Sequence, residues 1–453
     1  MPIIVHPAGA ERPKVLCGQG VAPSAATIDA VCSQGVQRMP GMGMLPAVVP
    51  GAFDAWMMLL LEHGTLSLRE VLTPAIGYAR NGYPLVHRAA ESIHAIAPLF
   101  RSDWHHSAEV WLPNDRAPMP GERVCQPQIA DAYARLLREA EAAGSDREVQ
   151  IAAARRAWSE GFVAEAIDSF YRTEQADGNG GRHKGLLTGQ DMADWQASWD
   201  TTVHANFAGL TVHKTGPWGQ GPALLMALSM LQSIGIDQTE PGSADWIHLS
   251  IEALKLALAD RDAFFGDPEH VDVPMRLLMS SKYLADRAGQ IGDAASAALS
   301  PGNPLGDDVD RAALLMELAA RPEEASGGGE PTFADLPEIE GDTCHLDVVD
   351  AEGNLVSATP SGGWLQSSPA VPRLGFNVTT RGQMFWLDPR MPSALAPGRR
   401  PRTTLTPTVV TREGKPILGL GSPGGDQQDQ WALGLILRHL VQGLNLQAAI
   451  DAP

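Results

Sequence analysis

Residues 341–359 read GDTCHLDVVDAEGNLVSAT, and this stretch decides the fold because a strand-like pattern begins abruptly within it. The segments 344–350 and 355–359 both have the composition of short strands. The four residues between them, 351–354, include the glycine and asparagine that favour a tight turn. The stretch therefore predicts a β-hairpin that starts directly after Thr343.

The segment before this hairpin has a different composition. Residues 321–341 read RPEEASGGGEPTFADLPEIEG and consist mainly of Gly, Pro and acidic side chains. Because such a segment cannot bury enough apolar surface to pack, we expect an exposed and mobile linker. Taken alone, a linker that ends at a strand is typical of a plain domain boundary.

Helical patterns dominate the chain ahead of the linker. Residues 128–142 predict one helix, and a second starts after Ser243, a residue type that caps helices. The predicted apolar face of this second helix comprises Ile247, Ile251, Leu254 and Leu258. Beyond the hairpin, residues 406–411 and 416–421 predict further strands, and residues 430–440 predict a helix.

The junction between Asp342 and Thr343 suggests a specific chemistry. A threonine hydroxyl is a weak nucleophile at neutral pH and needs a neighbouring base. If the chain breaks before Thr343, the new α-amine, with a reference pKa of about 8, can serve as that base. The simpler interpretation is an ordinary threonine at the edge of a strand.

Two further segments favour the chemical interpretation. Residues 421–425 read GSPGG between a predicted strand and a predicted helix. Glycines there allow close backbone approach, and N–H groups near a helix start favour developing negative charge. Residues 399–408 read RRPRTTLTPT, in which Thr403 and Thr404 both offer hydroxyl donors. By themselves, a glycine-rich turn and adjacent threonines are more often structural.

Taken together, these segments resemble the gamma-glutamyltransferase family of N-terminal-nucleophile hydrolases. Blocks at 49–51, 72–76 and 253–274 are similar to the large subunit of that family, so the resemblance covers nearly the whole chain. It implies an α+β fold, a four-layer αββα sandwich with two central sheets between helices. It also implies that 1–342 is equivalent to the large subunit and 343–453 to the small subunit, and that both form one folded unit.

The resemblance assigns roles to particular residues. It implies self-cleavage between Asp342 and Thr343, after which Thr343 attacks the substrate and its own α-amine takes the proton. The N–H groups of Gly424 and Gly425 would form the oxyanion hole. Water or an amine would complete the reaction, so hydrolysis and transfer both stay open. No metal and no organic cofactor is implied.

Several positions depart from the family's pattern for recognising a glutamyl group. Gln19 stands where an arginine holds the α-carboxylate, Gly363 where an asparagine binds substrate, and Trp386 where an aspartate receives the α-amine. Gln383 matches a substrate-binding Gln or Glu, and Ser361 replaces a threonine that supports the nucleophile. Because the charged groups are missing, a zwitterionic α-amino acid would leave a buried charge unpaired, which is costly.

The run PSGGW at 360–364 and the run GDQQDQ at 425–430 are similar to the oxamate amidohydrolase branch of the family. The substrate of that branch is a small amide that bears a carboxylate and no α-amine. We therefore expect Trp386 to fill the space of the missing amino end, although a core or lid role for this indole is equally open. The candidates to bind the carboxylate are Arg402, Thr403 and Thr404.

Three other interpretations stay open. One is a gamma-glutamyltransferase that hydrolyses glutathione with an altered pocket, and another is an acylase of different specificity. The third is an inactive, truncated paralogue. The family has a helix and strands ahead of the part that matches Val5 onward, and more strands after the part that matches Pro453. We therefore expect a fragment or a shifted start, which would also hide any signal peptide.

The amino-acid composition limits the kinds of partner that the chain can bind. The chain has 453 residues, of which 44% are hydrophobic, as suits a globular protein with a large core. The formal charge of -19 disfavours nucleic acid and anionic membranes. No apolar run reaches the ~20 residues of a membrane helix. We expect a cytoplasmic enzyme that binds a small-molecule amide and whose two self-cleaved fragments stay associated, with room for a homodimer.

The sequence shows no strong metal or disulfide pattern. The four cysteines form no CxxC pair, and we expect reduced or buried thiols. Trp104-His105-His106 offers two adjacent histidines. On a strand these would point to opposite faces, which makes them a poor metal pair.

Overall fold

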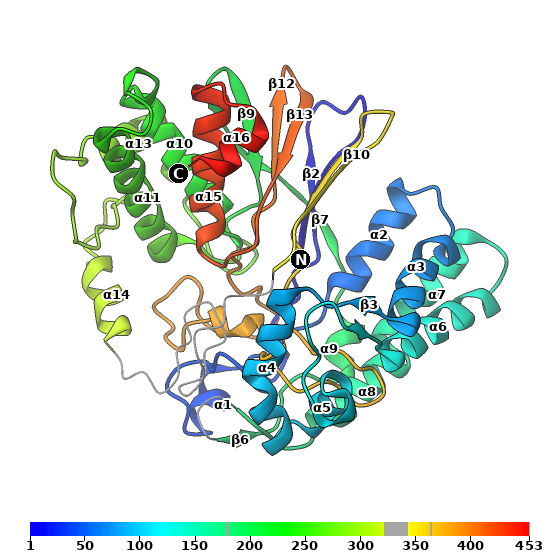
Figure 1. Cartoon of the computed structure of the whole chain (residues 1–453). Helices are drawn as coiled ribbons and strands as arrows, with labels where there is room; N and C mark the ends of the chain where they lie inside the picture. Colours follow the sequence, from blue (N-terminus) through cyan, green and yellow to red (C-terminus); the bar gives the residue numbers. More distant parts are fainter. Residues whose placement is uncertain (178–180, 321–342, 363–364, 453) are drawn as a thin grey trace.

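The computed structural model describes residues 1–177, 181–320, 343–362 and 365–452. Two antiparallel sheets lie at its centre (Figure 1). In spatial order, the strands of the first sheet are β10 (Leu346–Val349), β11 (Leu355–Ala358), β1 (Pro2–His6), β2 (Lys14–Cys17) and β7 (Ser198–Thr201). Those of the second sheet are β13 (Lys415–Leu420), β12 (Thr408–Arg412), β9 (Leu210–Lys214) and β8 (Val203–Phe207).

Helices flank the pair of sheets on both sides (Figure 1). Beside the second sheet are α10 (Gly221–Ser233), α11 (Ala244–Phe264), α13 (Ser281–Ala288), α15 (Gln427–Ile436) and α16 (Leu446–Asp451). On the side of the first sheet are α2 (Ala52–His63), α3 (Leu68–Asn81), α6 (Pro127–Ala142), α7 (Arg147–Ser159) and α8 (Phe162–Tyr171). Further helices are α1 (Ile28–Cys32), α4 (His87–Ser102), α5 (His105–Trp111), α9 (Gly189–Ala193), α12 (Met275–Leu278) and α14 (Arg311–Ala319).

The alternation of side chains along two strands fixes the order of the layers. Neighbouring residues on a strand point to opposite faces of its sheet. Ile4 of β1 and Val409 of β12 meet in one buried cluster between the sheets. Ile3 packs instead against α2, and Val410 packs against α10. The layers therefore follow one another as helix, sheet, sheet and helix, and the α+β class is confirmed.

The predicted hairpin is present and joins strands from both ends of the chain. Leu346 of β10 lies opposite Ala358 of β11, and Ala358 in turn lies opposite Ile3 of β1. In the second sheet, Val409 of β12 lies opposite His213 of β9. Segments from before and after the Thr343 junction therefore share both sheets. The predicted linker at 321–341 lies outside the described residues.

The structure corrects three expectations about the front of the chain. Five central strands, β1, β2, β7, β8 and β9, come from the part that reads as mostly helical, because strands this short leave little periodic signal. The helix after Ser243 is present as α11, but only half of its predicted face packs. Ile247 and Ile251 are 50% and 49% exposed, whereas Leu254 and Leu258 pack against the core. Its buried face centres on Ala253 and Ala257, which let α10 approach closely. His105 opens helix α5 rather than lying on a strand.

Candidate active site

Thr343 and Ser361 meet at one end of the β10–β11 hairpin. Thr343 precedes β10 and Ser361 follows β11, so the antiparallel register brings them together. The hydroxyl of Thr343 donates to the hydroxyl of Ser361 at 3.1 Å, and Thr343 is only 8% exposed. A candidate nucleophile and a supporting hydroxyl are thus in contact, as the sequence predicts, while their chemical roles stay predictions.

A histidine that is not among the sequence-based candidates lies two residues beyond Thr343. The ring of His345 contacts the hydroxyl of Thr359 through Nδ1 at 2.9 Å and a carboxylate oxygen of Asp347 through Nε2 at 2.8 Å. The i, i+2 spacing of His345 and Asp347 on an extended segment puts both on one face, and this was the available signal. A Cβ added to Gly421 would lie 2.3 Å from Cε1 of the ring. His345 therefore joins the Thr343 segment to the glycine loop.

The loop after β13 presents two glycines in left-handed backbone conformations. The φ angle is 114° at Gly424 and 54° at Gly425, a region that favours glycine. Their carbonyls accept from the N–H groups of Gln427 and Gln428, at 2.9 and 3.2 Å, where α15 begins. Within the described ranges, neither glycine N–H donates to a protein acceptor. Two adjacent donors of this kind can stabilise an oxyanion.

Asp426 ties the glycine loop to two arginines. Its Oδ1 lies 3.1 Å from Arg261 Nη1 and 3.3 Å from Arg402 Nη1. Burial by itself would raise the pKa of Asp426, but the two guanidinium groups outweigh burial and hold that pKa at about 2. Arg402, a predicted partner of the substrate carboxylate, is therefore already paired with a protein carboxylate.

The adjacent threonines lie beside the glycine loop. Thr403 and Thr404 are 0% and 1% exposed, and the hydroxyl of Thr403 accepts from the N–H of Leu405 at 3.2 Å. With its amide oriented to satisfy its neighbours, Gln428 donates to the carbonyls of Thr404 and Ser422, both at 3.1 Å. This bridge holds the threonine pair and the glycine loop together. A contact between the threonines and the substrate stays a prediction.

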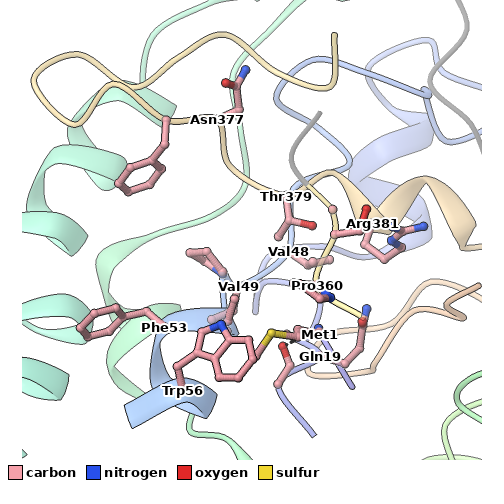
Figure 2. A pocket seen from close by; sticks show the side chains of 18 of the residues that line it. Met1, Gln19, Val48, Val49, Phe53, Trp56, Pro360, Asn377, Thr379 and Arg381 are labelled. Atoms are coloured by element: carbon pink, nitrogen blue, oxygen red, sulfur yellow. Dashed lines mark hydrogen bonds between the residues drawn. The ribbon is translucent and has the colours of Figure 1, made fainter. Parts of the chain in front are cut away.

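A cavity of about 420 Å³ opens beside the Thr343–Ser361 pair (Figure 2). Ser361 and Cys344, the neighbour of Thr343, lie in its wall together with the buried side chains of Gln19 and Arg381. Of the described lining residues, Arg381 alone has a charged side chain, and none is acidic. The aromatic part of the wall consists of Phe53, Trp56, Tyr133, Trp158 and Phe376.

Two further predicted site residues, Trp386 and Gln383, are not among the described residues that line this cavity. The indole of Trp386 packs against the buried cluster of the second sheet, and its backbone pairs with that of Ala394. Its position favours packing over a place in the acyl pocket. Gln383 is 1% exposed in the short helix Arg381–Met384. Asp342 and Gly363 lie outside the described residues.

In the described part of the chain, no group of three or more His, Cys, Asp or Glu side chains could hold a metal ion. Across the same ranges, no helix is both long and apolar enough to cross a membrane. Among the cysteines, Cys17 is a buried thiol, whereas Cys32 and Cys125 are exposed thiols.

Known proteins are similar to this chain in sequence and in fold. The gamma-glutamyltranspeptidase family model matches residues 3–453. The glutathione hydrolase-like YwrD proenzyme of Bacillus subtilis (strain 168) is 30% identical over 422 residues, which cover 93% of this chain and 69% of that protein. The oxamate amidohydrolase proenzyme of Klebsiella pneumoniae is 29% identical over 463 residues, which cover 100% of this chain and 74% of that protein.

Solved structures agree with the sequence matches. A structure of LmbA2991HD superimposes with a TM-score of 0.89 at 46% identity, covering 100% of this chain and 76% of that one. Cephalosporin acylase from Bacillus halodurans superimposes with a TM-score of 0.81 at 27% identity, covering 100% and 73%. The chain spans 63–69% of the length of three curated relatives that it matches.

Proposed function

Because the chain belongs to the gamma-glutamyltranspeptidase family, we propose that it is a self-processing amide hydrolase whose nucleophile is Thr343. The cut would fall between Asp342 and Thr343 and divide the chain into fragments 1–342 and 343–453. The observation that carries the proposal is the contact of Thr343 with Ser361 at the start of β10, beside a cavity and a glycine loop. The helix, sheet, sheet, helix order supports the four-layer sandwich of N-terminal-nucleophile hydrolases.

The proposed reaction has two steps. In the first, Thr343 Oγ1 bonds to the amide carbon while its proton passes to the freed α-amine of Thr343. The C–N bond then breaks, the leaving amine takes that proton, and an acyl ester remains on Thr343. In the second step water attacks the ester, which releases the carboxylic acid and restores the hydroxyl. An amine in place of water would give transfer.

Three groups are proposed to assist these steps. The N–H groups of Gly424 and Gly425 are candidates to stabilise the oxyanion of each tetrahedral intermediate. Ser361 accepts a hydrogen bond from the nucleophile and would hold Oγ1 in its attacking orientation. Thr403 and Thr404 would shape the same corner of the site through the Gln428 bridge.

The proposed substrate is an amide whose acyl group bears a carboxylate and no α-amine, with oxamate as the small member of the class. The absence of any acidic side chain from the described cavity wall supports this, because an α-ammonium group would have no counter-ion there. One relative is named an oxamate amidohydrolase. A glutathione hydrolase is the alternative that another relative's name suggests, and the uncharged Gln19 weighs against it.

Intact mass and ammonia release test the proposal together. Purified full-length protein should separate into two fragments, the smaller beginning Thr343-Cys344-His345. It should then release ammonia from oxamate or succinamate. A chain that stays whole after long incubation and releases no ammonia would leave only the inactive-paralogue interpretation.

A further inference from the structure

We propose that the cavity beside Thr343 recognises two groups on one substrate, a carboxylate bound by Arg381 and a flat apolar group bound by a wall of aromatic rings. This inference rests on the proposed function, because it defines the substrate class of the same site. It also changes that class, since oxamate carries only the first of the two groups.

Arg381 supplies the cationic end of the cavity. Its side chain is 2% exposed, lies in the cavity wall and is the charged side chain among the described lining residues. A guanidinium has five N–H donors in one plane, so it can bind a substrate carboxylate in addition to its protein contacts. Two other arginines are less suited, because Arg402 is paired with Asp426 and Arg373 lines a different cavity.

The opposite end of the cavity is aromatic. In Figure 2, Phe53 and Trp56 lie on the side away from Arg381. Phe53 and Trp158 stack with their centroids 4.6 Å apart and their planes within 15°. Tyr133 extends this stack beyond Phe53 at 6.3 Å, and Phe376 extends it beyond Trp158 at 5.6 Å. Four rings from α2, α6, α7 and the segment near Phe376 thus form one column in the cavity wall.

The size of the cavity fits both groups at once. A cavity of about 150 Å³ is enough for one benzene ring. At about 420 Å³, the cavity has room for a ring, a carboxylate and the scissile amide together. If oxamate were the substrate, the aromatic wall would remain in contact with water. The apolar contacts that ligand pockets of this size normally make with their ligands would then be missing. The ring column is therefore better matched by an aryl or similarly flat acyl group.

Binding of three inert ligands tests the inference without relying on catalysis. We would measure, by calorimetry, the Kd of 3-phenylpropionate, which carries both groups, of propionate, which carries the carboxylate, and of 3-phenylpropanol, which carries the ring. An aromatic contact contributes about a 2- to 12-fold gain in affinity and a buried charge pair more. We expect 3-phenylpropionate to bind at least tenfold tighter than either of the others. Equal binding of all three would overturn the inference.

Variants assign each group to its end of the cavity. Arg381→Gln should weaken 3-phenylpropionate at least tenfold and leave 3-phenylpropanol unchanged, whereas Phe376→Leu should weaken both phenyl ligands and leave propionate unchanged. Matched controls are Arg390→Gln, an ion-paired arginine outside the cavity, and Phe162→Leu, in the same core cluster but not in the wall. If the effects are reversed, or equal to those of the controls, the assignment is wrong.

The comparison of the three ligands on the wild-type protein remains valid even if a variant does not fold. Ammonia release from succinamate and from 2-phenylsuccinamate separates this inference from the proposed function. Hydrolysis of both amides at the same rate would contradict the aromatic wall and keep the hydrolase. Hydrolysis of neither, with tight binding of 3-phenylpropionate, would contradict the hydrolase and keep the two-group site.

Discussion

The hydroxyl of Thr343 donates a hydrogen bond of 3.1 Å to the hydroxyl of Ser361. Because Ser361 lies in the cavity wall, this contact places the candidate nucleophile beside the cavity. Ser361→Ala removes the acceptor, so we expect kcat for amide hydrolysis to fall about 10- to 100-fold, as loss of positioning does. Ser361→Thr should keep most of the activity. Ammonia release measures this, and an unchanged kcat in Ser361→Ala would remove Ser361 from the mechanism.

Self-cleavage should depend on the side chain at position 343. Thr343→Ala has no hydroxyl to attack the preceding carbonyl, so this variant should remain one chain of 48.2 kDa. Thr343→Ser keeps the hydroxyl and should cleave slowly. Denaturing electrophoresis over time with N-terminal sequencing of the smaller fragment follows the reaction. Cleavage of Thr343→Ala at the same rate as wild type would point to a contaminating protease.

Gamma-glutamyl compounds should be poor substrates. Gln19 in the cavity wall is uncharged, and the described wall contains no carboxylate to receive an α-ammonium group. We expect kcat/KM for glutathione to be at least about 100-fold below that for succinamate, which corresponds to about 3 kcal/mol for an unpaired buried charge. Side-by-side assays of both compounds decide this. Comparable values would mean that Arg381 and a group not in the described wall bind the amino acid head.

Trp386→Ala should affect stability rather than specificity. The indole packs against the cluster of the second sheet and is not among the described residues of the cavity wall, which favours the core role that the sequence left open beside the pocket role. Removing a half-buried indole should cost about 2 kcal/mol, less than the loss of a fully buried one. Urea unfolding measures the cost, and an amide panel should show the same ranking of small and bulky acyl groups. A changed ranking would return Trp386 to the pocket.

The Asp426 cluster should make stability depend on pH in the acid range. The arginines lower the folded-state pKa of Asp426 to about 2, so its contribution is present above the unfolded pKa of about 4 and is lost as pH falls through 2. Asp426 keeps contact with solvent, so Asp426→Asn should cost only about 1 kcal/mol at pH 7. Unfolding curves of variant and wild type should converge below about pH 2. A constant difference at all pH values would contradict the ionic explanation.

The sequence was most informative where backbone constraints are strict. The turn at Gly353 and Asn354 predicted the hairpin, and the adjacent Gly424 and Gly425 predicted a loop that only glycines can form. The site at Thr343 followed from resemblance and from the chemistry of hydroxyl nucleophiles. These features depend on a few residues that are neighbours in the chain, so they can be predicted from the sequence.

Features that depend on contacts between distant segments were missed. The exposed Ile247 and Ile251 have helical spacing, but the packing of α10 selects the alanine face of α11 instead. The ring column needs Phe53, Tyr133, Trp158 and Phe376 from four segments, which no local pattern connects. Arg381 and Trp386 are five positions apart in the chain, yet only Arg381 lies in the cavity wall.

The interleaving of strands across the Thr343 junction has a consequence for the cut enzyme. β1 lies between β11 and β2, and β9 lies between β12 and β8, so each sheet contains strands from both sides of the proposed cut. A single hydrolysed peptide bond would change the chain's connectivity while leaving every one of these ladders intact. To separate the two fragments, the same contacts between strands would have to break as in unfolding. The mature protein would thus behave as an obligate heterodimer, in which separation of the fragments and unfolding are one step, and its stability would depend on protein concentration, unlike that of the uncut chain.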